Sequence, residues 1–95
     1  MSLDINWTPK ATEGFNAILS FVEDNYSTST TDKLFDDVQQ WLARIKILPS
    51  ICPLSKQHNI RKCVVKKHYL LLYKIVPNTT IQVVAFIDAR SNHSY

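Results

Sequence analysis

The stretch Ile60–Arg90 constrains the fold most, because apolar segments of strand length alternate there with short polar breaks. Ile60–Lys66, Tyr69–Val76 and Thr80–Asp88 each have the length of a β-strand. The breaks between them, at Lys67-His68 and after Val76, are short enough to join antiparallel neighbours. Tyr69–Val76 is strongly apolar, which indicates a central strand. Both faces of Ile60–Lys66 are mixed, so its alternation leaves the core-facing side open.

The first half of the chain predicts one strand followed by two helices. Ser2–Trp7 alternates apolar and polar residues with the period of a half-buried strand. Thr8 suits a helix N-cap and Pro9 suits the first helical position, where its missing N–H costs nothing. The polar, hydroxyl-rich segment Asn25–Thr31 predicts a break and a new N-cap. The second helix is expected to end before Pro49.

Each predicted helix carries an apolar stripe at helical spacing, which indicates a buried face. The stripes consist of Ala11, Phe15, Ile18, Leu19, Val22 and Tyr26, and of Leu34, Val38, Trp41, Leu42, Ile45 and Leu48. The expected fold is therefore α+β with the order β-α-α-β-β-β. A helical hairpin packs on one face of a mainly antiparallel four-stranded sheet, and residues 1–95 form a single domain.

Charge is distributed unevenly along the chain. Residues 1–53 carry four basic and seven acidic side chains, a net charge of −3. Residues 54–95 carry seven basic side chains and one acidic residue, Asp88, a net charge of +6. A basic sheet half beside an acidic helical half favours either a polyanion or an acidic protein partner, or is simply a solvated basic face.

The composition favours a cytoplasmic protein without a membrane span. Residues 1–10 have no apolar segment of the secretory type, and the longest apolar runs are too short to cross a bilayer. Cys52 and Cys63 are the two cysteines, with no second pair for a metal site. They are expected to be reduced, partly buried thiols. Neither a metal nor another cofactor is expected.

Five segments, in this order, resemble the RelE/ParE superfamily of bacterial toxins. They are Trp7–Ala11 at the first strand-to-helix junction, Pro53 in the connector, Arg61 at the start of the second strand, Tyr69–Ile75 in the third strand, and Ile87–Arg90 at the close of the fourth. The resemblance covers nearly the whole chain. His68 stands where the family often has a glycine before the third-strand tyrosine.

The resemblance implies the toxin of a type II toxin–antitoxin pair, held inactive by an antitoxin segment that wraps it. It also implies one of two activities. RelE-like members cut mRNA in the ribosomal A site, and ParE-like members poison DNA gyrase. A toxin–antitoxin hetero-oligomer is expected in either case.

Metal-independent RNA cleavage needs an activated 2′-hydroxyl, a stabilised phosphorane and a protonated leaving oxygen. Arg61 and Arg90 match the family pattern and suit bidentate phosphate binding. His93 is a candidate general acid or base, and Tyr95 a candidate for stacking on a base or donating a proton. The expected catalytic residues are these four. The expected RNA-binding residues are Lys56, Lys62, Lys66 and Lys67.

Each candidate also has a structural alternative, since Arg61 and Arg90 suit ion pairs with Asp88 or another surface acid. Three functions follow, in order of preference. The first is a ribosome-dependent mRNA endoribonuclease. The second is a DNA gyrase inhibitor without catalytic activity of its own. The third is a degenerate toxin that retains only antitoxin binding.

Overall fold

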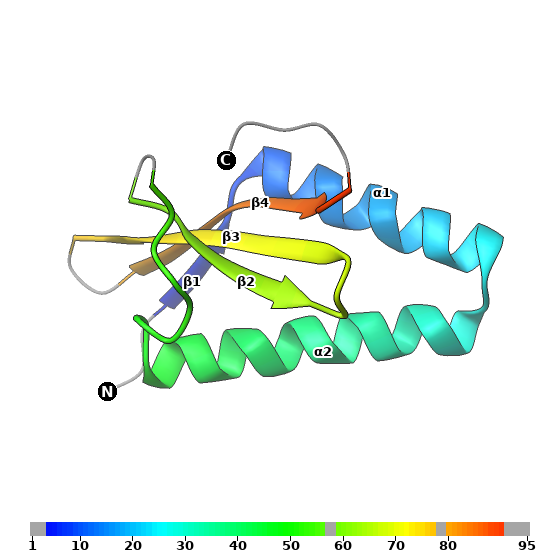
Figure 1. Ribbon diagram of the computed structural model, residues 1–95, viewed down its shortest axis with the longest axis horizontal. Coiled ribbons are helices and arrows are strands. Elements are labelled where there is room, and N and C mark those ends of the chain that lie inside the picture. Colours follow the sequence, from blue (N-terminus) through cyan, green and yellow to red (C-terminus); the bar gives the residue numbers. More distant parts are fainter. Residues whose placement is uncertain (1–3, 57–58, 78–79, 91–95) are drawn as a thin grey trace.

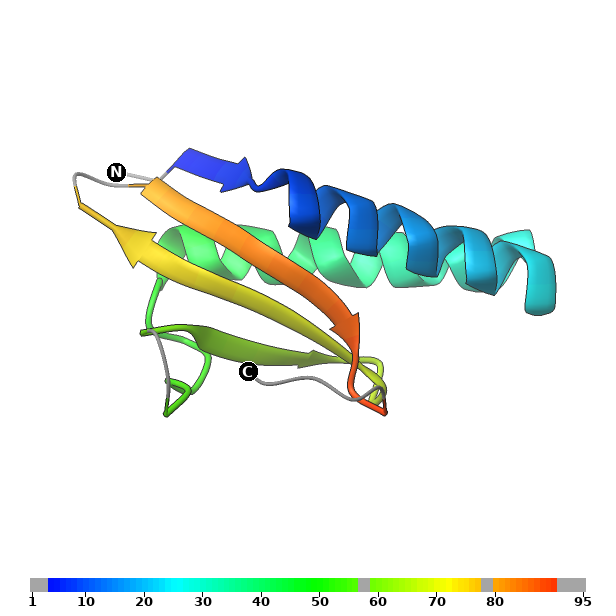
Figure 2. The same cartoon turned by 90° about the horizontal axis from the view of Figure 1, so that it is seen from above.

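The apolar segments of the C-terminal half form neighbouring strands of one sheet. The computed structural model describes residues 4–56, 59–77 and 80–90. The order is the expected one: β1 (Asp4–Trp7), α1 (Pro9–Asn25), α2 (Thr28–Ile47), β2 (Arg61–Val65), β3 (Tyr69–Val76) and β4 (Thr80–Asp88). Both helices cover the same face of the sheet (Figures 1 and 2). The predicted α+β fold is confirmed.

The strand order is β1-β4-β3-β2, so β3 and β4 are the inner strands. β3 pairs antiparallel with both β2 and β4, and β1 adds to β4 in parallel. This arrangement is the mainly antiparallel sheet expected from the sequence.

The main core lies between the helices and the sheet. Its apolar side chains come from every element except β1, whose Ile5 and Trp7 pack against it while partly buried. Tyr26 and Leu48 depart from the predicted stripes, because each follows the last residue of its helix. They are 66% and 52% exposed. Trp41 packs against the core as expected, with the Arg44 guanidinium over its ring.

Thr8 joins the start of α1 to the inner strand β4. Its hydroxyl accepts a hydrogen bond from the Ala11 N–H at 3.1 Å, as predicted for an N-cap. The same hydroxyl donates to the Val84 carbonyl at 3.3 Å. Val84 is the extra residue of a β-bulge, since Leu72 pairs with Ala85 and Tyr73 pairs with Val83. The cap therefore also supplies a partner to the bulged carbonyl.

The structure decides which face of β2 meets the core. Cys63 and Val65 are buried under the helices, and Val64 on the opposite face is 57% exposed. A second apolar group lies on the face away from the helices, where Ile60, Leu72 and Ala85 are buried. The mixed pattern of this strand thus reflects apolar contacts on both faces of the sheet.

The turn between β2 and β3 explains why no glycine is needed before the third-strand tyrosine. The left-handed backbone falls on Lys66 (φ 52°) and Lys67 (φ 69°). His68 is not among the described residues with positive φ. The left-handed conformation is thus one or two positions earlier than the glycine of the family pattern.

The expectation of two reduced cysteines is wrong, because Cys52 and Cys63 form a disulfide with their Cα atoms 5.3 Å apart. The connector after α2 turns back along the outer edge of β2. The 11-residue separation of the two cysteines in the sequence does not predict this path. The Lys62 N–H donates to the Pro53 carbonyl at 3.0 Å, and Leu54 pairs with Arg61 in an antiparallel bridge. This return path brings the two sulfur atoms together at the border of the core.

No helix within the described ranges is both long enough and apolar enough to cross a membrane.

Candidate functional site

A pocket of about 280 Å³ lies where β3 begins and β4 ends, between the far ends of the two helices. We call it the rim pocket. Val22, Leu34 and Tyr69 give it a buried apolar side. Its basic side chains are Lys33, Lys66, His68 and Arg90, and Tyr26 and Thr30 complete the lining.

Two of the basic side chains already have carboxylate partners. Lys66 lies 3.3 Å from an Asp37 oxygen. The Arg90 guanidinium binds both oxygens of Asp88, with Nε–Oδ1 at 3.0 Å and Nη2–Oδ2 at 2.7 Å. The structural alternative for Arg90, a pair with Asp88, is therefore present. In the part of the chain that the structure describes, no carboxylate pairs with Lys33.

The protonation states in this region follow from these contacts. Hydrogen bonding from Arg90 lowers the pKa of the Asp88 carboxyl. Burial raises the pKa of the Tyr69 phenol, and the Asp88 charge adds to this rise, whereas the Arg90 charge opposes it. The rim pocket therefore presents a neutral phenol and an anchored ion pair at neutral pH. An apolar group that carries one carboxylate suits this lining better than a dense polyanion does.

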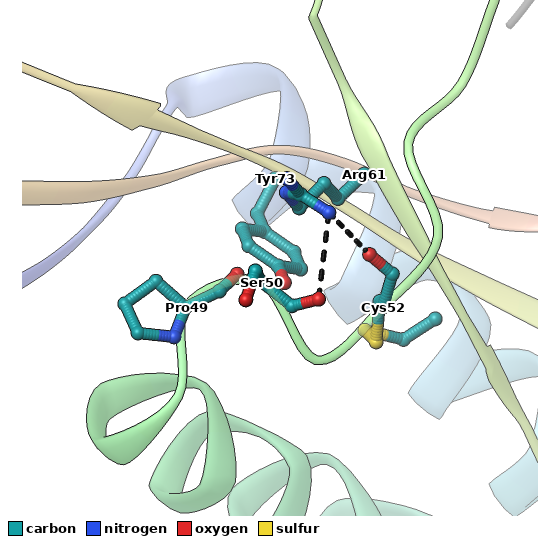
Figure 3. The surroundings of a disulfide bond; sticks show 6 residues. Pro49, Ser50, Cys52, Arg61 and Tyr73 are labelled. Atoms are coloured by element: carbon teal, nitrogen blue, oxygen red, sulfur yellow. Dashed lines mark hydrogen bonds between the residues drawn. A yellow bond between two sulfur atoms is a disulfide. The ribbon is translucent and has the colours of Figure 1, made fainter.

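Arg61 lies at the start of β2, away from the rim pocket, and contacts the connector. Its Nη1 donates to the Cys52 carbonyl at 2.9 Å and to the Ser50 carbonyl at 3.4 Å (Figure 3). Arg61 pairs with Tyr73 in the sheet, whereas Tyr69 pairs with Asp88, two residues before Arg90. Four residues of strand separate these positions, a distance of about 13 Å. The two arginines are therefore not brought together.

The predicted RNA-binding lysines are divided in the same way. Lys66 and Lys67 belong to the β2–β3 turn, and of the two only Lys66 lines the rim pocket. Lys62 pairs with Leu72 near the start of β2, and Lys56 is exposed in the connector. His93 and Tyr95 lie outside the described residues. Among the described residues, no group of three or more His, Cys, Asp or Glu side chains has the arrangement of a metal site.

Sequence reasoning did not identify Lys33, His68 or Tyr69 as residues of a common site. They come from α2, from the turn before β3 and from β3 itself, and only the packing of the helical hairpin over the sheet joins them. The sequence contained one signal for this site. Tyr26 stands at the end of a predicted apolar stripe and His68 directly precedes an apolar strand, so both lie where an element begins or ends.

Three comparisons with known proteins bear on the family. The family model described as "ParE toxin of type II toxin-antitoxin system, parDE" matches residues 5–93. A solved structure titled "Chromosomal ParDE TA system from P. aeruginosa" has a TM-score of 0.76 to this chain at 13% sequence identity. That alignment covers 94% of this chain and 98% of the other, and it shows a common fold. No curated protein sequence matches the chain. Because the family match spans nearly the whole sequence, the chain belongs to the ParE toxins of type II toxin–antitoxin systems, within the RelE/ParE superfamily.

Proposed function

We propose that this protein is the toxin of a parDE pair, that it inhibits DNA gyrase by binding to it, and that a cognate antitoxin neutralises it. The observation that carries the proposal is the match of the ParE family model over residues 5–93. It favours the second function considered from the sequence over mRNA cleavage, which that reasoning placed first. Residues 1–95 are proposed as one toxin domain that acts in the cytoplasm, where gyrase is found.

The contacts of the two candidate arginines support an inhibitor that acts by binding. Arg61 is engaged with two connector carbonyls, and Arg90 is engaged with Asp88. An enzyme that cleaves RNA with both side chains needs them on one phosphate, whereas Arg61 lies beside Tyr73 in the middle of β3 and Arg90 follows Asp88 beside Tyr69 at its start. An inhibitor needs only a complementary surface, so this arrangement suits it without rearrangement.

The rim pocket is proposed as a contact site for the antitoxin. Its apolar side fits a buried side chain, and Lys33 offers a cation to a nearby carboxylate. Such a combination is characteristic of protein–protein contacts, in which an apolar anchor gives affinity and charge gives orientation.

The test uses the purified chain, DNA gyrase and the protein encoded by the adjacent gene. We expect the chain alone to inhibit supercoiling of relaxed plasmid and the adjacent gene product to reverse the inhibition. In bacteria that express the chain alone, thymidine incorporation should fall before amino-acid incorporation. Primer extension that shows cuts inside translated codons would instead support the endoribonuclease. Normal growth at confirmed soluble expression would support the degenerate toxin.

A further inference from the structure

Exposed apolar side chains gather in one short segment at the end of α2 and in the connector. Ile47 is 84% exposed, Leu48 is 52%, Ile51 is 38% and Leu54 is 55%. We call these four side chains the connector patch. Of the nine large apolar side chains that are exposed in the described part of the chain, four therefore lie within eight consecutive positions. Such a concentration on a loop is typical of an interaction site.

The backbone of this segment is fastened to the sheet although its side chains are exposed. The Cys52–Cys63 disulfide joins it to β2 (Figure 3). The Arg61 guanidinium donates to the Ser50 and Cys52 carbonyls, and the buried Tyr73 hydroxyl donates to the Pro49 carbonyl at 2.5 Å.

A turn inside the segment holds two members of the patch near each other. The Ile51 N–H donates to the Leu48 carbonyl at 3.0 Å, which closes a four-residue turn. Together with the contacts to the sheet, the turn orders the segment before any partner binds. Ordering of this kind lowers the entropy cost of association, and the connector patch is therefore preorganised for docking.

The charge around the patch indicates the chemistry of the surface that it fits. No acidic residue occurs between Asp37 and Asp88 in the sequence. Lys46 and Lys56 are exposed on either side of the patch along the chain. A complementary surface is an apolar groove bordered by carboxylates.

We infer that the connector patch is the surface through which this toxin docks on DNA gyrase, in an apolar groove edged by acidic side chains. The inference rests on the proposed function, because an inhibitor without catalysis must present such a surface to its target. The rim pocket, assigned to the antitoxin, is lined by Tyr69 at the start of β3, whereas the connector is held at Arg61 and Tyr73, four strand residues farther along. The Cys52–Cys63 disulfide preorganises the gyrase-binding surface, so the oxidised protein binds gyrase more tightly than the reduced protein.

The first experiment compares the wild type with the double variant Ile47→Ser/Leu54→Ser. These side chains are mostly in solvent, so the variant is expected to fold. The concentration that halves supercoiling should rise about tenfold or more, and affinity for the adjacent gene product should not change. The matched control is Phe21→Ser/Val64→Ser, whose side chains are 53% and 57% exposed elsewhere. It should resemble the wild type in both assays.

The second experiment uses the Cys52→Ser/Cys63→Ser variant and wild-type protein incubated with dithiothreitol until both thiols can be titrated. Reduction transfers two electrons and two protons to the disulfide and leaves dithiothreitol as a cyclic disulfide. Both samples should inhibit gyrase a few-fold more weakly than the oxidised wild type, and dithiothreitol should not alter the variant further.

The outcomes separate the two levels of the proposal. If the oxidised wild type inhibits gyrase and the Ile47→Ser/Leu54→Ser variant inhibits it equally, the docking surface is wrong and the proposed function stands. If the oxidised wild type neither binds nor inhibits gyrase, the proposed function fails and this inference fails with it. Equal inhibition by the oxidised and reduced forms would overturn the role of the disulfide.

Discussion

Gly14 lies where α1 comes close to β4. A Cβ atom at this position would lie 2.6 Å from the Phe86 carbonyl oxygen, so the helix or the strand would have to move. Overpacking of this kind costs about 1–3 kcal/mol, and the gain in helix propensity returns about 1 kcal/mol. The net expectation is that Gly14→Ala lowers the free energy of unfolding by up to about 2 kcal/mol in urea titration. Asn16→Ala, on the exposed side of α1, should not destabilise. A Gly14→Ala variant about 1 kcal/mol more stable than the wild type would show that α1 and β4 accommodate the Cβ atom at no steric cost.

The phenol of Tyr69 makes the free energy of unfolding depend on pH in the alkaline range. Its pKa is raised above 10.0 by burial and by Asp88, so the folded state holds this proton more tightly than the unfolded chain does. The protonated Tyr69 phenol contributes fully to the free energy of unfolding at pH values below its pKa in the unfolded chain. This contribution is lost as the pH rises through its higher pKa in the folded protein.

Tyr69→Phe removes this dependence. The variant should have nearly wild-type stability at pH 7 and a smaller decrease of stability above pH 10. Burial also raises the pKa of Tyr73, against opposing effects of the Cys52 backbone and Arg61, so part of the decrease should remain. Urea titrations between pH 8 and 11 measure the difference, and parallel curves for the two proteins would contradict it.

At the scale of elements, α1 and β4 share the hydroxyl of Thr8. The side chain caps the helix through the Ala11 N–H and also donates to the bulged Val84 carbonyl. Thr8→Ala removes both contacts and should destabilise the protein by about 1–2 kcal/mol in thermal or urea unfolding. Thr8→Ser retains a hydroxyl, so its loss of stability should be less than half of the loss caused by Thr8→Ala. If both variants lose the same amount, the threonine methyl group rather than the hydroxyl is responsible.

The charge asymmetry of the whole molecule bears on antitoxin binding. The basic C-terminal half should attract an acidic partner, so the association rate should fall with added salt, as electrostatic steering requires. Lys33→Glu should weaken binding of the adjacent gene product about five- to tenfold and reduce the salt dependence. Lys10→Glu makes the same charge change about 18 Å from Val22 along α1 and should have a smaller effect. Titration calorimetry at two salt concentrations compares them, and equal losses would remove the rim pocket from the interface.

The sequence by itself determined the order of the elements, the caps at Thr8 and Pro9, the end of α2 before Pro49 and the extent of β3 and β4. These features depend on the periodicity and backbone preferences of a few adjacent residues, which any chain with these residues would share. Together with the family resemblance, they were sufficient for the fold.

Only the tertiary structure decided the core face of β2, the Cys52–Cys63 disulfide, the rim pocket and the separation of Arg61 from Arg90. Each depends on which residues of distant segments become neighbours when the strands pair and the helices pack. The register places Arg61 opposite Tyr73 and Tyr69 opposite Asp88, which separates the two arginines by four residues of β3. Local sequence patterns do not predict that register, because it is set by the burial of side chains across the whole core.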